Sequence, residues 1–106
     1  MDAATFEPHF RQALAEFALA QQGAMMNITV HNLLAFMQRK GYPMLENEGS
    51  MRNLTNAFLS DFFGPTWDGA KYRKLRNGDG NSSKGRSLLI GTDNVLDSLR
   101  YRGVVA

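Results

Sequence analysis

Apolar residues recur at intervals of three and four in the first part of the chain, which is the spacing that buries one face of a helix. Residues 5–22 follow this pattern and predict a first helix, with Thr5 as its N-cap and Gly23 as its end. Pro8 falls in the opening turn, where a missing backbone N–H is tolerated. The predicted inner face consists of phenylalanine, leucine and alanine: Phe6, Phe10, Ala13, Leu14, Phe17 and Ala18.

The same period predicts two further helices. The second has Asn27 or Thr29 as its N-cap and ends at Gly41, which is followed by a tyrosine and a proline. The third spans residues 50–63, with Ser50 as its cap, and ends before a Gly-Pro pair. Its predicted buried stripe is made of large apolar side chains: Met51, Leu54, Phe58 and Phe62.

Beyond the third helix the pattern changes to that of short strands. Residues 71–76 and 86–90 flank the segment NGDGNSSKG, whose glycines and asparagines suit a tight turn, so a β-hairpin is predicted over residues 71–91. Thr92-Asp93 then caps a short helix over residues 92–103. Trp67, in the turn before the hairpin, is expected to fill the core between the third helix and the hairpin.

These elements predict a mostly α fold with a small β-hairpin. A chain of 106 residues that is 43% hydrophobic suits one domain over residues 1–106, with a helical core at about 5–63. No apolar run approaches the roughly 20 residues of a membrane helix, and the first residues do not resemble a secretory signal. The absence of cysteine fits a reducing compartment. We therefore expect a soluble, cytoplasmic protein with no membrane partner.

Charge is distributed unevenly along the chain. Residues 1–70 carry four lysines and arginines against seven acidic residues, whereas residues 71–86 carry six against one. The six cations are Lys71, Arg73, Lys74, Arg76, Lys84 and Arg86. A concentrated positive block is either a solvated loop or a surface whose countercharge comes from a polyanion.

Three helices followed by a basic hairpin and a short helix resemble the winged helix-turn-helix domains that bind nucleic acid. The resemblance is one of element order and charge over about residues 5–100. It implies a winged-helix-like three-helix core, with helix 50–63 in the major groove and the hairpin, or wing, on the phosphate backbone. The groove-facing side chains would be Arg52, Asn53, Asn56 and Ser60, which share the side of the helix opposite Met51, Leu54 and Phe58. All six hairpin cations would contact phosphates.

On this interpretation the chain is a small DNA-binding protein, a transcriptional regulator of phage, plasmid or bacterial type. Its partner would be double-stranded DNA, with RNA not excluded, and a homodimer could form through the helix at residues 5–22. The alternative is a protein-interaction module, an inhibitor or adaptor, that presents the basic hairpin to an acidic partner.

Each candidate residue also has a plainer interpretation. Arg52, Asn53 and Asn56 would equally suit the solvated face of an amphipathic helix, and cations on an exposed strand also prevent edge-to-edge pairing. Tyr72 and Tyr101 would pack against the fold or stack on bases.

Catalytic and metal-binding patterns are weak. His9 and His31 lack the spacing of a zinc site and have no cysteine partners, and no G-x-S-x-G sequence is present. We therefore expect no enzyme activity, no metal and no cofactor.

Overall fold

The computed structural model describes the backbone of residues 3–76 and 82–104 and the side chains of residues 3–70 and 85–104. Helices and strands follow one another as α1 (Ala3–Leu19), β1 (Met25–Ile28), α2 (Val30–Lys40), α3 (Glu48–Phe63), α4 (Pro65–Asp68), β2 (Lys71–Arg76), β3 (Ser82–Gly91) and α5 (Thr92–Tyr101). The fold is mostly helical with an antiparallel hairpin, as predicted.

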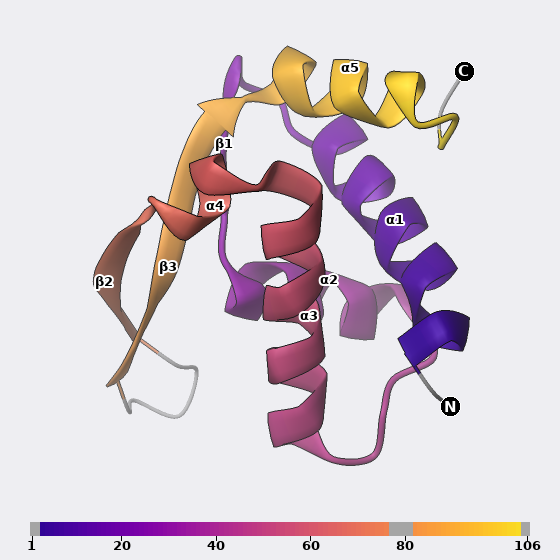
Figure 1. The fold of residues 1–106 in the computed structure, drawn as a ribbon, viewed down its shortest axis with the longest axis vertical. Coiled ribbons are helices and arrows are strands. Elements are labelled where there is room, and N and C mark those ends of the chain that lie inside the picture. The colour runs from indigo at the N-terminus through magenta and orange to yellow at the C-terminus, as the bar shows by residue number, and fades with distance from the viewer. Residues whose placement is uncertain (1–2, 77–81, 105–106) are drawn as a thin grey trace.

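The helices enclose the core, and the sheet stands at one side of them (Figure 1). α1 packs against α2, α3 and α5, and α5 runs across one end of the molecule. The largest fully buried side chains come from every helix and from β1; they are Trp67, Phe6, Phe10, Leu14, Met26, Ile28, Leu33, Met37, Leu59 and Leu99. The prediction that Trp67 fills the core is confirmed, because its side chain is fully buried.

Helix α2 begins and ends at the residues that its sequence signals indicate. The Oγ1 of Thr29 accepts a hydrogen bond from the backbone N–H of Asn32 at 2.9 Å, so Thr29 is the N-cap and the alternative, Asn27, is not. Gly41 at the other end has a φ of 80°, the left-handed conformation that glycine adopts without strain.

Helix α1 is displaced from its predicted boundaries. It begins at Ala3 and ends at Leu19, so Thr5 lies inside the helix and Gly23 lies four residues beyond its end. Pro8 consequently falls in the second turn, where it leaves the carbonyl of Ala4 without its usual helical donor. Ala4 is exposed, so water can satisfy that carbonyl. The residues predicted to form the inner face of this helix lie in the core, apart from the partly buried Phe17.

Two further predicted N-caps are wrong. The cap of α3 is Asn47, whose Oδ1 accepts from the backbone N–H of Ser50 at 2.8 Å, so the cap lies three residues before the predicted one. The cap of α5 is Gly91, and Thr92 is the first helical residue. The Thr92 hydroxyl instead donates to the carbonyl of Gly23 at 3.1 Å, which ties the start of α5 to the segment before β1.

The structure has a third strand that the sequence pattern did not reveal. β1 pairs antiparallel with β3, so the strands lie in the order β1-β3-β2. Met26 and Ile28 of β1 are buried and alternate with the exposed Met25 and Asn27. β3 is also longer than predicted, since it begins at Ser82 instead of Arg86. The hairpin is thereby joined to the helical core through β3.

Candidate nucleic-acid interface

The four predicted groove residues of α3 lie along one stripe of the helix but differ in what they contact. Arg52, Asn53 and Asn56 are exposed, and Ser60 is half-buried. The Nη2 of Arg52 lies 3.3 Å from the Oε1 of Glu48, one turn earlier, in an exposed ion pair. Such a pair contributes little to stability, so Arg52 can exchange it for another anion at small cost.

The short helix α4 packs across the C-terminal half of this stripe. Gly64 ends α3 with φ 59° and ψ −133°, a region open essentially to glycine alone, and Pro65 follows at the first position of α4. The chain therefore turns back onto α3. The Nε1–H of Trp67 donates to the Oδ1 of Asn56 at 3.1 Å. The hydroxyl of Ser60 donates to the Oδ1 of Asp68 at 2.6 Å.

These contacts divide the α3 stripe into two halves. Asn56 and Ser60, which the sequence placed in a groove, are hydrogen-bonded to α4, whereas Arg52 and Asn53 face solvent. The exposed carboxylate of Asp68, on α4, lies beside Ser60 at this half and repels phosphate. The N-terminal half of α3 is thus the part whose polar side chains are free of α4.

The hairpin is described at the level of its backbone. Lys71, Arg73, Lys74 and Arg76 lie on β2, and Lys84 and Arg86 lie on β3. The register pairs Lys74 with Lys84 and Tyr72 with Arg86. The tip at residues 77–81 lies outside the described residues. Figure 1 shows the far ends of β2 and β3 toward the same end of the molecule as the N-terminus of α3.

Arg86 differs from the other candidate cations because its side chain is described. Its Nη1 donates to the backbone carbonyl of Ala70 at 3.1 Å, at the base of the hairpin, and the residue is half-buried. Arg86 therefore connects the two strands to the end of α4, a structural contact that the sequence did not predict. Tyr101, which was expected to pack or to stack on bases, is 94% exposed near the end of α5.

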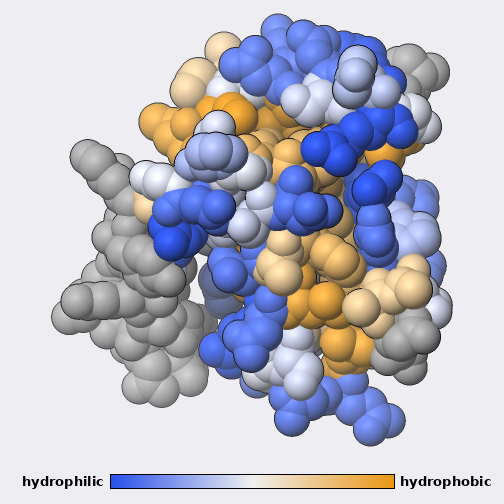
Figure 2. Space-filling model, viewed as in Figure 1, coloured by the Kyte–Doolittle hydropathy of each residue, from blue (hydrophilic) through white to orange (hydrophobic). Residues whose placement is uncertain are grey.

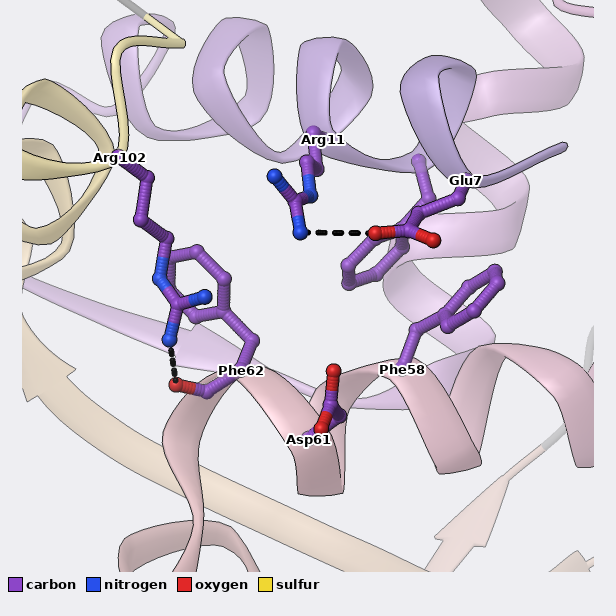
Figure 3. A pocket seen from close by; sticks show the side chains of 7 residues that line it. Glu7, Arg11, Phe58, Asp61, Phe62 and Arg102 are labelled. Carbon is purple, nitrogen blue, oxygen red and sulfur yellow. Dashed lines mark hydrogen bonds and ion pairs between the residues drawn. The ribbon is translucent and has the colours of Figure 1, made fainter. Parts of the chain in front are cut away.

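Two hollows offer alternative sites. One lies between α1, α3 and the residue after α5, and has a cavity volume of about 10 Å³ (Figure 3). Phenylalanines line it, and its two arginines are already engaged: Arg11 Nη2 lies 2.7 Å from Glu7 Oε1, and Arg102 donates to the carbonyl of Phe62 at 3.1 Å. Ligand pockets usually measure about 300–1,000 Å³, so this hollow is small for a ligand. On this face Figure 2 shows apolar residues between α3 and α1, crossed by hydrophilic ones.

The second hollow is an open depression beside Tyr42, at the end of α2. The phenol oxygen of Tyr42 is enclosed and makes no hydrogen bond of good geometry to any described residue. Burial, followed by the nearby carboxylate of Glu16, raises the pKa of Tyr42 to about 12. The phenol is therefore neutral at physiological pH and is not set up as a base.

Neither metal-binding nor membrane-spanning features stand out in the described ranges. Within residues 3–76 and 82–104, no three histidine or acidic side chains gather as metal ligands would. His9 instead packs edge-on against the ring of Tyr42, with ring centres 6.3 Å apart. Over the same residues, no helix has the length and apolar content to cross a bilayer.

Comparison with known proteins found no relative. A scan against models of protein families, a search of curated proteins and a search of solved structures each returned no match to this chain.

Proposed function

We propose that this chain is a small DNA-binding protein of the winged helix-turn-helix type, acting as a transcriptional regulator. In this proposal the basic hairpin lies on the phosphate backbone, and the exposed side of α3 from Arg52 to Asn56 approaches a groove. The observation that carries the proposal is the register of the hairpin, which sets Lys74 directly opposite Lys84.

Like charges directly opposite each other destabilise a pair of strands. Neither β2 nor β3 contains an acidic residue that would compensate the repulsion within the strands. Edge protection accounts for one or two lysines on a strand, but it does not require two lysines facing each other. A row of phosphates would supply the missing countercharge, and this makes a polyanion the natural ligand.

The position of α3 supports the second part of the proposal. α2 and α3 follow each other in the core, and the hairpin comes directly after the turn at α4, as the resemblance to winged helix domains implies. Arg52 and Asn53 are exposed on the first turns of α3, and Asn56 keeps its amide N–H₂ beyond its bond to Trp67. Arginine and asparagine are side chains that hydrogen-bond to base edges.

The test is duplex binding as a function of salt. Fluorescence anisotropy with mixed-sequence duplex DNA is measured at 50 and 200 mM salt, where contacts to four or five phosphates give a logarithmic slope of roughly −4 and a loss of about two to three decades in affinity. We expect salt-sensitive duplex binding. The absence of binding to duplex DNA and to single-stranded RNA at 50 mM would overturn the proposal and favour an acidic protein partner. Tighter binding to RNA than to duplex would overturn it in favour of RNA.

A pair of double variants makes the test specific to the hairpin. Lys74→Ala with Lys84→Ala should reduce the salt slope by about 2, at 0.9 per lost phosphate contact. Arg39→Ala with Lys40→Ala removes the same charge from the exposed end of α2 and should leave the slope unchanged. Equal effects of the two double variants would mean that net charge alone, and not the hairpin, governs binding.

The homodimer through residues 5–22 remains a prediction. Because Phe6, Phe10 and Leu14 of α1 are buried in the protomer, a dimer contact on α1 would have to use its outer side, where Leu19 is 62% exposed. Light scattering coupled to size-exclusion chromatography measures the mass in solution. A monomer at the concentrations used for DNA binding would exclude a dimeric binding unit.

A further inference from the structure

The hydrogen bond between Trp67 and Asn56 fixes the orientation of the Asn56 side-chain amide. An indole N–H is only a donor, so the atom of Asn56 that faces it, 3.1 Å away, must be the amide oxygen. The usual ambiguity between the oxygen and nitrogen of an asparagine amide is therefore removed. The Nδ2 is bonded to the same carbon as Oδ1 and points away from the indole. No described residue accepts a hydrogen bond from it.

This arrangement is rigid on the Trp67 side. Trp67 is completely buried, and α4 is held at both ends, by the turn at Gly64 and by the bond between Asp68 and Ser60. Asn56 itself is exposed on α3. The buried tryptophan thus holds one end of an exposed amide and leaves the donor end in solvent.

We infer that Trp67 is a positioning residue for base recognition: by holding the oxygen of Asn56, it makes Asn56 a donor that reads the N7 atom of a purine. This inference rests on the proposed DNA-binding function and extends it to the chemistry of the base that α3 recognises. A free asparagine distinguishes adenine by donating to N7 and accepting from the N6 amino group at once. In this chain the indole occupies one of the two acceptor positions of Oδ1 and holds this oxygen toward α4, so Oδ1 cannot turn to the N6 amino group without giving up that bond.

The protein should therefore prefer certain bases at the one position of the DNA site that Asn56 contacts. N7 is an acceptor on both adenine and guanine, whereas neither pyrimidine offers an acceptor at that place in the major groove. The wild-type protein is expected to prefer purines over pyrimidines there, with adenine and guanine bound about equally. Releasing Oδ1 from the indole should add a preference for adenine.

The experiment begins with site selection on the wild-type protein, which finds the preferred duplex and the position that depends on Asn56→Ala. Affinities for all four bases at that position are then measured for the wild type and for Trp67→Phe. Phenylalanine keeps an aromatic ring in the core, removes the N–H donor and leaves part of the indole's volume unfilled. We expect the ratio of adenine to guanine affinity to rise about fivefold or more in Trp67→Phe, the lower end of what one bidentate base contact contributes. This ratio compares two duplexes with one protein sample, so partial unfolding of the variant cancels.

A second measurement needs no substitution in the protein. Replacing the purine at the Asn56-dependent position with its 7-deaza analogue removes N7 and leaves the base pair intact. Binding of the wild type should fall about fivefold or more, which corresponds to loss of the single base contact, while 7-deaza substitution of purines outside the site has no effect.

The outcomes separate the two proposals. If the wild type binds no duplex at low salt, the proposed function fails and this inference fails with it. If it binds with the expected salt dependence, but 7-deaza substitution is silent or the base ratio is unchanged in Trp67→Phe, the inference alone is overturned. In that case Trp67 has only the structural role of holding α4.

Discussion

Replacing Asn56 with alanine should destabilise the folded protein even when no nucleic acid is present. The Oδ1 of Asn56 is the acceptor for the indole N–H of Trp67, and the Trp67 side chain is fully buried. A hydrogen bond contributes about 0.5–1.5 kcal/mol net, but a buried donor left without an acceptor costs about 1–3 kcal/mol. Alanine recovers a few tenths of a kcal/mol through its better helix propensity. The expected loss in the free energy of unfolding is therefore about 1–2 kcal/mol.

A double-mutant cycle isolates this bond from other effects. Trp67→Phe removes the donor, so Asn56→Ala should change stability by less than about 0.5 kcal/mol in the Trp67→Phe background. The propensity difference cancels in the cycle, and the coupling energy should be about 1–2 kcal/mol. The assay is urea denaturation followed by far-ultraviolet circular dichroism, because a fluorescence signal would be lost with the only tryptophan.

Asn53→Ala is the matched control. Asn53 lies three residues earlier on the exposed side of α3, so its replacement tests helix propensity alone. It should leave stability unchanged or raise it by a few tenths of a kcal/mol. If Asn53→Ala and Asn56→Ala have the same effect, or if the coupling energy in the cycle is zero, the bond does not hold α4 on α3 and the reasoning is refuted.

Three further changes test local features of the fold. Gly64→Ala should cost about 1–3 kcal/mol through backbone strain alone, because Gly64 has φ 59° and its added Cβ would meet no atom within 4 Å; an unchanged urea midpoint would contradict this. Thr29→Ala should cost about 1 kcal/mol by removing the cap of α2, and Thr29→Ser, which keeps the acceptor, should recover most of it. The raised pKa of Tyr42, about 12 when folded against 10 when unfolded, means that stability is complete below pH 10 and falls as the pH rises toward 12. Tyr42→Phe should lose less stability than the wild type over that interval. Identical dependence of the urea midpoint on pH in the two proteins would show that Tyr42 does not cause the loss.

The features that were predicted from the sequence have causes within a few residues of each other. The cap at Thr29, the left-handed glycine at position 41 and the Gly-Pro pair that ends α3 are set by local backbone chemistry. The hairpin follows from two strand-forming stretches around a turn-forming segment. The burial of Trp67 was predicted correctly because a large aromatic side chain between two elements usually packs into the core.

The features that were missed depend on partners far along the chain. β1 has four residues, too few for its alternation to be distinguished from a loop, and it exists because it pairs with β3, 60 to 66 residues later. α4 has a single turn, and its placement on α3 depends on contacts that join Asn56 and Ser60 to residues 8 to 11 positions ahead. Helix periodicity placed Asn56 and Ser60 on the exposed stripe, but it carries no information about a later segment that packs there.

The structure of β3 explains how the hairpin charges are held in relation to the helices. Residues 82–87 of β3 pair with β2, and residues 88–91 pair with β1. Leu88 lies in the core at the point where one pairing gives way to the other, and Gly91 leads directly into α5. The first half of β3 therefore belongs to the hairpin, and its second half belongs to the core.

Because β3 belongs to both the hairpin and the core, a change in the β1–β3 pairing could disturb the proposed interface without any change in its charged residues. Asn27 Oδ1 accepts from the hydroxyl of Ser87 at 2.7 Å, beside the point where β3 leaves the core. Weakening the β1–β3 pairing would change how Lys74 and Lys84 are placed relative to Arg52, although none of these three residues is substituted. In the proposed complex, backbone contacts by the hairpin and groove contacts by α3 would thus be coupled through β3, because a duplex presents phosphates and base edges at a fixed spacing.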